Sequence, residues 1–96
     1  MSTEVIEKPK TAPPSGGVGD QWRVIVLNDN HNTFDGVASA LSRTLPGVSL
    51  EAGHQMASRI DSQGMDIVWS GHKELAELYW DMLKSAGLTM APLEQG

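Results

Sequence analysis

The chain contains no cysteine. It can therefore form neither a disulfide framework nor a thiolate metal site, and a domain of this size must be held together by its apolar core. Apolar residues make up 40% of the sequence and charged residues 20%, a balance that permits a core and argues against a disordered polyelectrolyte. The absence of cysteine also suits a reducing compartment, so we expect a cytoplasmic protein.

Long apolar runs and an excess of positive charge are also missing. No stretch approaches the roughly 20 apolar residues that span a bilayer, and the N-terminus lacks the basic-then-apolar layout of a secretory signal. The formal net charge of −5 opposes binding to nucleic acid, which depends on neutralising phosphates, and it favours a partner that carries positive charge. We therefore expect neither a membrane nor a nucleic acid as a partner.

Two regions of the chain differ in composition. Residues 1–20 hold three of the five prolines and three of the ten glycines, and they show no sustained apolar period. Such a stretch cannot offset the entropy lost on ordering, so we expect a flexible N-terminal tail. Residues 21–96 then form one domain, near the lower size limit at which a single core is sufficient.

Apolar periodicity predicts the order of the elements in this domain. Short alternating runs rich in β-branched residues indicate strands, and stripes with a spacing of three and four residues indicate helices. Gly64 and Gly87 are placed to end two of the helices, and Pro92 confines the last strand to a sheet edge or a strand end. The predicted strands cover 22–27, 65–69 and 88–93, and the predicted helices begin near 33, 49 and 71.

The resulting order, β-α-α-β-α-β, predicts an α+β fold. Because the strands are few and are separated by helices, the economical arrangement is a small three-stranded antiparallel sheet with three helices packed on one face. In the second strand, Met65, Ile67 and Trp69 alternate with Asp66 and Val68, which predicts one wetter side. The core-facing stripe of the third helix is expected to comprise Leu75, Leu78, Tyr79, Met82, Leu83 and Ala86.

A polar loop, residues 28–33, follows the first predicted strand. Five of its six residues are Asn, Asp or His, which favour turns and helix caps. The loop is either a turn with a cap or a cluster of hydrogen-bond acceptors held between rigid elements. It is not a calcium loop, because Thr33 stands where the required Gly would be and Ser39 where the closing Glu would be.

No catalytic or metal-binding motif is present in the sequence. His31, His54 and His72 fall on three different predicted elements and lack the i, i+4 spacing of a metal-binding pair. No phosphate loop, nucleophile elbow or zinc-protease motif occurs either. An enzyme is therefore unsupported, and we expect neither a catalytic residue, nor a metal, nor a cofactor.

Several separate segments occur in the same order as in a known family. They are Val24-Ile25-Val26-Leu27-Asn28-Asp29-Asn30, Asn32-Thr33-Phe34, Gln63-Gly64, Ala76-Glu77-Leu78-Tyr79 and Ala86-Gly87-Leu88-Thr89-Met90-Ala91-Pro92-Leu93-Glu94. Together they resemble the Clp protease adaptor family, ClpS, in the branch found in photosynthetic bacteria and plastids. The resemblance runs from about Trp22 to Leu93 and does not include the tail.

This resemblance implies an adaptor that performs no chemistry. Members of the family bind bulky hydrophobic N-terminal residues, typically Leu, Phe, Tyr and Trp, which mark proteins for degradation (N-degrons). They dock on the N-terminal domain of a Clp AAA+ ATPase, and a flexible tail assists delivery of the substrate protein. We accordingly expect a cytoplasmic monomer with two kinds of partner, the ATPase and its substrates.

The resemblance also implies a role for individual residues. The α-amino group of a substrate is expected to bind Asn28, Asp29 and Asp61, because an ammonium needs acceptors, preferably anionic ones. Docking on the ATPase is expected to involve Glu74 and Tyr79. The hydrophobic pocket is expected to comprise Asn32, Phe34, Val37, Ala57, Leu88 and Thr89.

Some positions depart from the family's usual pattern. Asn30 stands where a second acidic residue is usual, Asp61 replaces a histidine that normally accepts from the ammonium, and Ala57 is smaller than the usual residue. A carboxylate at position 61 would keep the acceptor role and add charge attraction, unless Asp61 is only a solvated helix-end residue. The smaller Ala57 would deepen the pocket and alter its preference.

Two other functions are therefore compatible with the sequence. The missing histidine, and Tyr79 in place of a basic residue, fit a regulator that docks on the ATPase without binding N-degrons itself. A metal hydrolase built from Asp and His would require a bound metal ion.

Overall fold

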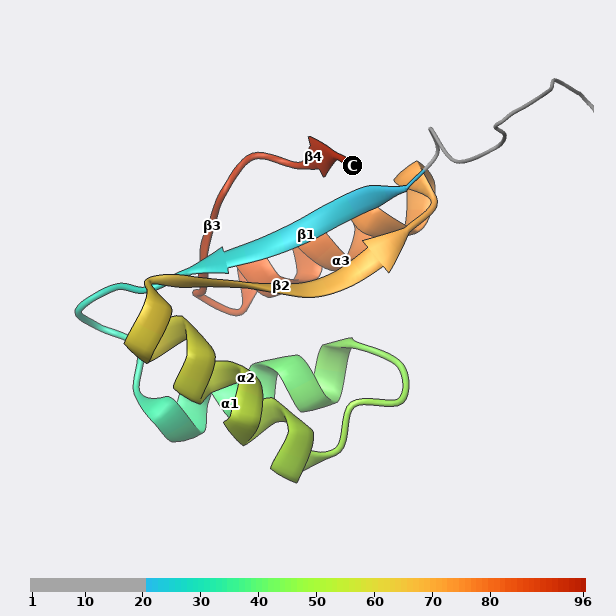
Figure 1. The fold of residues 1–96 in the computed structure, drawn as a ribbon. Helices are drawn as coiled ribbons and strands as arrows, with labels where there is room; N and C mark the ends of the chain where they lie inside the picture. Colours follow the sequence, from blue (N-terminus) through green and yellow to red (C-terminus); the bar gives the residue numbers. More distant parts are fainter. Residues whose placement is uncertain (1–20) are drawn as a thin grey trace, which may run out of the picture.

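The computed structural model describes residues 21–96, and the tail predicted for residues 1–20 lies outside them. The predicted α+β order, β-α-α-β-α-β, is confirmed, with the last strand divided in two (Figure 1). The elements are β1 (Trp22–Leu27), α1 (Phe34–Thr44), α2 (Leu50–Gln63), β2 (Met65–Gly71), α3 (Lys73–Ser85), β3 (Thr89–Met90) and β4 (Glu94–Gln95).

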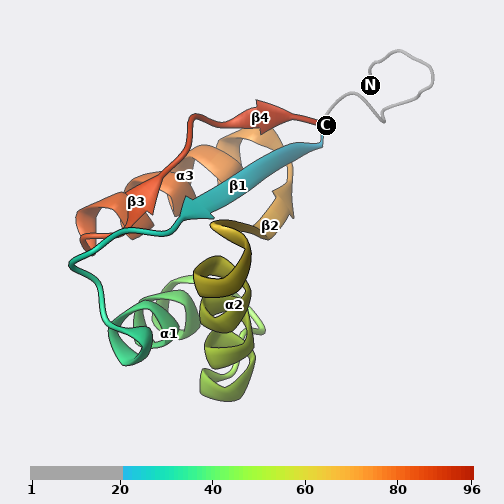
Figure 2. The ribbon, with the colours of Figure 1, turned by 60° about the vertical axis from the view of Figure 1, so that its left-hand side comes forward.

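β1 lies at the centre of the sheet. It pairs antiparallel with β2 along one edge and with β3 and β4 along the other. β3 and β4 form two halves of one edge strand, interrupted at 91–93, where Pro92 lacks the N–H that a ladder requires. The predicted three-stranded antiparallel sheet is therefore present, and its third strand is in two pieces (Figure 2).

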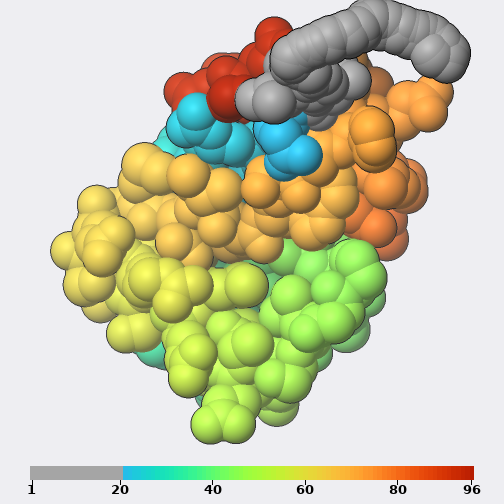
Figure 3. Space-filling model, turned by 45° about the vertical axis from the view of Figure 1, so that its right-hand side comes forward, coloured from blue at the N-terminus to red at the C-terminus, as the bar shows by residue number. Residues whose placement is uncertain are grey.

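One face of the sheet shares a single core with all three helices. α3 lies across this face, and the α1–α2 pair packs beside it (Figures 1 and 2). The surface of α2 continues directly into that of β2, which follows it in the chain (Figure 3). The largest fully buried side chains come from β1, α1 and α3, and they are Val24, Val26, Leu41 and Leu83.

Local side-chain chemistry sets the ends of the first two helices. The hydroxyl of Thr33 accepts a hydrogen bond from the backbone N–H of Gly36 at 2.9 Å and caps α1. The hydroxyl of Ser49 accepts from the N–H of Ala52 at 3.1 Å and caps α2. Gly64 ends α2 in the left-handed conformation, with φ of 87°, which a residue with a side chain rarely adopts.

The start of α3 and the faces of β2 differ from expectation. α3 begins at Lys73, two residues later than predicted, because β2 continues as far as Gly71. The wetter side of β2 carries Met65 and Ile67, which are 37% and 42% exposed, whereas Val68 is buried. The inner side also holds the half-buried carboxylate of Asp66, which Arg59 compensates with two hydrogen bonds of 3.1 Å.

The core-facing side of α3 also differs from the predicted stripe. Ala76 and Leu83 are fully buried and Tyr79 is half-buried. Because the apolar arc of the helix is broad, periodicity alone did not show that Ala76 belongs to the buried side. The small side chain of Ala76 lets the helix lie close against the sheet. The exposed members of the predicted stripe are Leu75, Leu78, Met82 and Ala86.

Both ends of the described chain meet at one corner of the sheet. The N–H of Gly96 donates to the carbonyl of Gln21 at 2.8 Å, and Trp22 pairs with Gln95 in the ladder between β1 and β4. α3 starts at the same corner, where the Nζ atom of Lys73 lies 5.2 Å from the ring centre of Trp22. The loop 28–33 leaves the opposite end of β1 (Figure 2).

The close approach of α1 and α2 yields a test of this packing. A Cβ atom on Gly53 would lie 2.5 Å from the backbone carbonyl oxygen of Ala38, so a side chain there must push the two helices apart. We expect Gly53→Ala to lower the free energy of unfolding by about 1–3 kcal/mol, although alanine favours helix by about 1 kcal/mol. Urea denaturation measures the change, and Ser58→Ala at an exposed site of α2 is the control. A Gly53→Ala protein as stable as the wild type would contradict this packing.

Candidate functional site

The loop 28–33 is tied to the end of α2. The backbone N–H of Asn28 donates to the carbonyl of Gly64 at 2.9 Å. This bond holds the start of the loop against the last turn of α2, which carries Asp61. The structure thus brings together two segments in which candidate acceptors were predicted.

Asp29 is the most heavily hydrogen-bonded side chain of the loop. Its Oδ1 atom accepts from the backbone N–H groups of His31 and Asn32, at 3.0 and 2.8 Å. Its Oδ2 atom accepts from Asn32 Nδ2 and Thr89 Oγ1, both at 2.7 Å. A carboxylate has about four lone-pair positions, so donors of the protein itself fill its acceptor capacity. The Thr89 hydroxyl, followed by the N–H of Asn32, holds the pKa of Asp29 far below its ordinary value.

Asn32 and Thr89 join the loop to the segment that follows α3. The second N–H of the Asn32 amide donates to the carbonyl of Gly87 at 2.9 Å. Gly87 adopts φ of 98°, and this left-handed turn leads the chain from α3 into β3. Thr89 pairs with Leu27 at the end of β1, so its hydroxyl is next to the point where the loop begins.

The other two predicted acceptors are open to solvent. The side chains of Asn28 and Asp61 are exposed, and neither makes a hydrogen bond to another residue within 21–96. The residues predicted to bind the α-amino group are therefore two exposed acceptors and one carboxylate whose oxygens already accept hydrogen bonds from the protein.

The predicted pocket residues fall into two groups. Val37, Ala57 and Leu88 are at most 9% exposed and belong to the common core cluster, so they come together as an apolar layer contributed by α1, α2 and the segment before β3. Phe34, the first residue of α1, is 46% exposed. Asn32 and Thr89 are half-buried and belong to the Asp29 network. Leu88 directly precedes Thr89, so the polar network and the apolar group adjoin at the segment before β3.

The two predicted docking residues lie on α3, away from the loop. Glu74 is exposed in the first turn of the helix. Tyr79 is half-buried, and its ring meets that of Trp69 edge-on at a centroid distance of 5.0 Å. Tyr79 therefore contributes to packing against β2 as well as to the surface.

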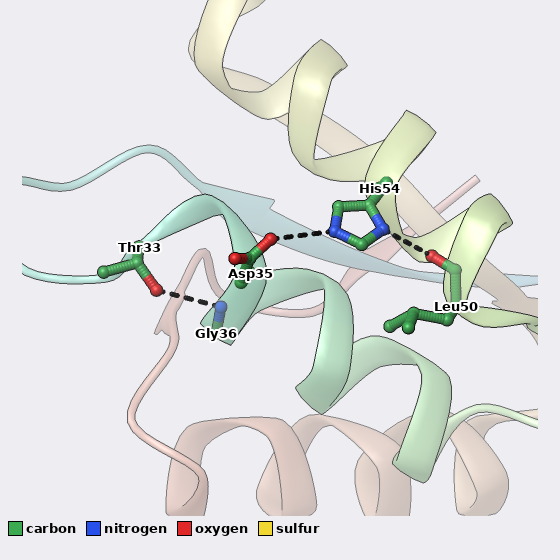
Figure 4. Close-up of polar contacts among 5 residues, drawn as sticks. All are labelled: Thr33, Asp35, Gly36, Leu50 and His54. Carbon is green, nitrogen blue, oxygen red and sulfur yellow. Dashed lines mark hydrogen bonds and ion pairs between the residues drawn. The ribbon is translucent and has the colours of Figure 1, made fainter.

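A further polar contact joins α1 to α2 and was not predicted. The Nε2 atom of His54 lies 3.0 Å from Oδ1 of Asp35, and its Nδ1 atom lies 3.0 Å from the carbonyl of Leu50 (Figure 4). The hydrogen bond to Asp35 is the main reason that the pKa of His54 is raised above its ordinary value of 6.5. The partners are 19 positions apart, so no local spacing points to the pair.

Hollows on the surface are found along α3, apart from the loop. One, of about 370 Å³, is lined by Glu77, Trp80, Asp81 and Leu93. Trp80 is held there by its indole N–H, which donates to the carbonyl of Ala91 at 2.7 Å. Trp80 thus fastens α3 to the chain between β3 and β4.

Within residues 21–96, no three His, Cys, Asp or Glu side chains are grouped so that they could hold a metal ion. No helix in the same range is long and apolar enough to cross a bilayer.

Comparisons with known proteins cover nearly all of the described chain. A family model described as "ATP-dependent Clp protease adaptor protein ClpS" matches residues 19–94. The ClpS adapter protein of Nostoc sp. is 47% identical over 73 residues, which are 76% of this chain and 75% of that protein. The ClpS adapter protein of Thermosynechococcus vestitus is 45% identical over 73 residues, 76% of this chain and 78% of that protein. The chloroplastic adapter CLPS2 of Chlamydomonas reinhardtii is 34% identical over 77 residues, 80% of this chain and 44% of that protein.

A solved structure has the same fold. The ClpS2 protein of Agrobacterium tumefaciens, bound to L-phenylalaninamide, matches with a TM-score of 0.72 and 20% sequence identity. The match covers 81% of this chain and 99% of that one. At this identity the likeness establishes the architecture.

The pair between Asp35 and His54 gives a pH-dependent prediction. A raised pKa in the folded state means that the pair stabilises the fold fully below pH 6.5, the ordinary value, and that this contribution is lost as the pH rises through the folded-state pKa. In an NMR titration we expect the pKa of His54 to fall in the Asp35→Asn variant. An unchanged pKa in that variant would show that Asp35 does not bind the imidazolium.

Proposed function

The chain belongs to the ATP-dependent Clp protease adaptor family, ClpS, and on this premise we propose that it binds hydrophobic N-terminal residues of substrate proteins and delivers them to a Clp AAA+ ATPase. The observation that carries the proposal is that the loop with the exposed acceptor Asn28 is hydrogen-bonded to Thr89, directly after Leu88, which shares the apolar core cluster with Val37 and Ala57. Such a site matches the two parts of an N-terminal residue, its ammonium and its side chain.

The ammonium end is assigned to Asn28, Asp29 and Asp61. An α-ammonium has three N–H donors, and the exposed oxygens of Asn28 and Asp61 offer acceptors for them. Asp29 adds a fixed negative charge nearby, because its lowered pKa keeps the carboxylate ionised. At an effective dielectric constant of 20, a carboxylate about 4 Å from an ammonium contributes about 4 kcal/mol before desolvation.

The side-chain end is assigned to the apolar layer of Val37, Ala57 and Leu88, with Phe34 at its exposed edge. Burying a large apolar side chain contributes about 1.5–3 kcal/mol. Asn32 and Thr89 would border this pocket on the loop side. The small Ala57 leaves more room in the proposed pocket than a longer side chain would, which favours substrates with a bulky N-terminal side chain.

The solved neighbour supports this class of ligand. L-phenylalaninamide, with which the Agrobacterium protein was solved, has a free α-amino group, an aromatic side chain and an amide in place of the carboxylate. These are the groups that the first residue of a peptide presents. We therefore include Phe, together with Leu, Tyr and Trp, among the N-degrons proposed for this chain.

Delivery requires a second surface, which we assign to α3. Glu74 is exposed at its start, and Tyr79 lies about one turn further along. We propose that this surface docks on the N-terminal domain of the ATPase, that the adaptor acts as a monomer, and that it performs no catalysis.

A second function is favoured by one specific observation. The protein's own donors fill the acceptor positions of Asp29, and Val37, Ala57 and Leu88 pack within the core. A chain whose site is closed in this way would act as a regulator that docks on the ATPase and changes its substrate choice without binding N-degrons.

A peptide titration separates the two functions. We expect a peptide that begins with Phe to bind, and N-acetylation to weaken binding about 100-fold, because the ammonium and its hydrogen bonds are lost. Fluorescence anisotropy measures both affinities. Equal affinities for the free and acetylated peptides would refute recognition of the amino group. No binding of either peptide, with altered degradation of other substrates by the ATPase, would favour the regulator.

The contribution of Asp61 has a matched control. We expect Asp61→Asn to weaken binding of the Phe peptide about tenfold, because the acceptor oxygen remains while the charge is lost. Asp81→Asn removes the same charge from the exposed side of α3 and should leave the affinity within about twofold of the wild type. If the two variants bind alike, Asp61 is only a solvated residue at the end of α2.

A further inference from the structure

Two kinds of donor fill the acceptor positions of Asp29. The N–H groups of His31 and Asn32 belong to the loop itself and fix its conformation. The Asn32 amide and the Thr89 hydroxyl are side-chain donors, and both reach the same carboxylate oxygen at 2.7 Å. An incoming ammonium would have to displace one of these donors before it could bind Asp29 directly.

The side-chain donors connect parts of the chain that are distant in sequence. Thr89 is 60 positions from Asp29, and the second contact of Asn32, to the carbonyl of Gly87, spans 55 positions. Both contacts end in the short segment between α3 and β3. Together with the pairing of Leu27 and Thr89, these hydrogen bonds connect the end of β1, the loop and the start of β3 to one another.

We propose that Asp29 is a positioning residue, whose carboxylate clamps the loop against residues 87–89 through Asn32 and Thr89 while other acceptors bind the substrate's ammonium. This inference rests on the proposed function. Asn28 and Asp61, whose side chains have no hydrogen-bond partner within residues 21–96, bind the ammonium. Asp29 holds the loop so that Asn28 stays opposite the last turn of α2.

Thr89→Val distinguishes the two possible roles of Asp29 by the sign of its effect. The substitution removes the hydroxyl donor and keeps nearly the same shape. If Asp29 bound the ammonium directly, the freed lone pair would be available to the substrate, and binding would stay equal or become tighter. If Asp29 is a clamp, the loop loses one of its attachments to β3, and binding weakens.

The experiment titrates wild-type protein and variants with a peptide that begins with Phe and with its N-acetylated form. We expect Thr89→Val to weaken binding of the free peptide about fivefold to tenfold, since a hydrogen bond to a charged group is lost. Thr89→Ser, which keeps the hydroxyl and loses the methyl, restores most of that loss. Thr44→Val, at the far end of α1, controls for the general effect of replacing Thr by Val.

A second variant and a second measurement cover the case in which Thr89→Val does not fold. Asn32→Ala removes the other side-chain donor to the same oxygen and is expected to weaken binding in the same direction. The ¹³C signal of the Asp29 carboxyl, followed against pH, reports the clamp without any peptide. Its pKa should rise in Thr89→Val and return to a low value in Thr89→Ser, because the Thr89 hydroxyl is the main cause of the lowered pKa.

The outcomes of the peptide titration separate the two roles of Asp29. Weaker binding in Thr89→Val, restored in Thr89→Ser, supports the clamp. Equal or tighter binding in a folded Thr89→Val or Asn32→Ala protein overturns it and makes Asp29 a direct ligand of the ammonium. If the wild type binds neither peptide, the proposed function fails and this role of Asp29 fails with it. The carboxyl titration then still shows separately whether the clamp exists.

Discussion

Asp29 accepts hydrogen bonds from its own loop and from a residue 60 positions further along the chain, and the candidate site exists only where these two segments meet. Hydrogen bonds to an ionised carboxylate are about twice as strong as those between neutral groups. One short side chain can therefore hold a loop made almost entirely of turn-forming residues. Thr33, the last residue of the loop, then caps α1.

The sheet supplies the rigid support for this arrangement. β1 is paired on both edges, and Val24 and Val26 bury its inner face, so the end of the strand presents the loop at a fixed place. Gly64 turns α2 back toward the same end of the sheet, where its carbonyl accepts from Asn28. Backbone contacts thus bring Asp61 beside the loop, and the side chains of Asn28 and Asp61 stay exposed to solvent.

Features encoded within a few residues could be predicted from the sequence. The alternation of side chains identified β1. Ser49 and Gly64 marked the two ends of α2, because helix caps depend on neighbouring backbone groups. The family resemblance, since confirmed, indicated which residues to place at the site, although their roles remain proposals.

Features that depend on long-range packing could not be predicted. The side of α3 that is buried depends on how closely Ala76 approaches the sheet. The apolar arc of the helix is broad, so the sequence pattern did not identify that side. The bond from Thr89 to Asp29 and the pair of His54 with Asp35 join residues with no periodic relation. Thr89 was assigned to the pocket by resemblance alone, and its hydrogen bond to the loop became visible only in the folded chain.

Gln21 and Gly96, the two ends of the described range, meet at one corner of the sheet. Both lie beside the start of α3, while the loop 28–33 lies at the other end of a six-residue strand, about 20 Å away. A label attached at Gly96 would therefore lie beside the start of α3 and far from the loop 28–33.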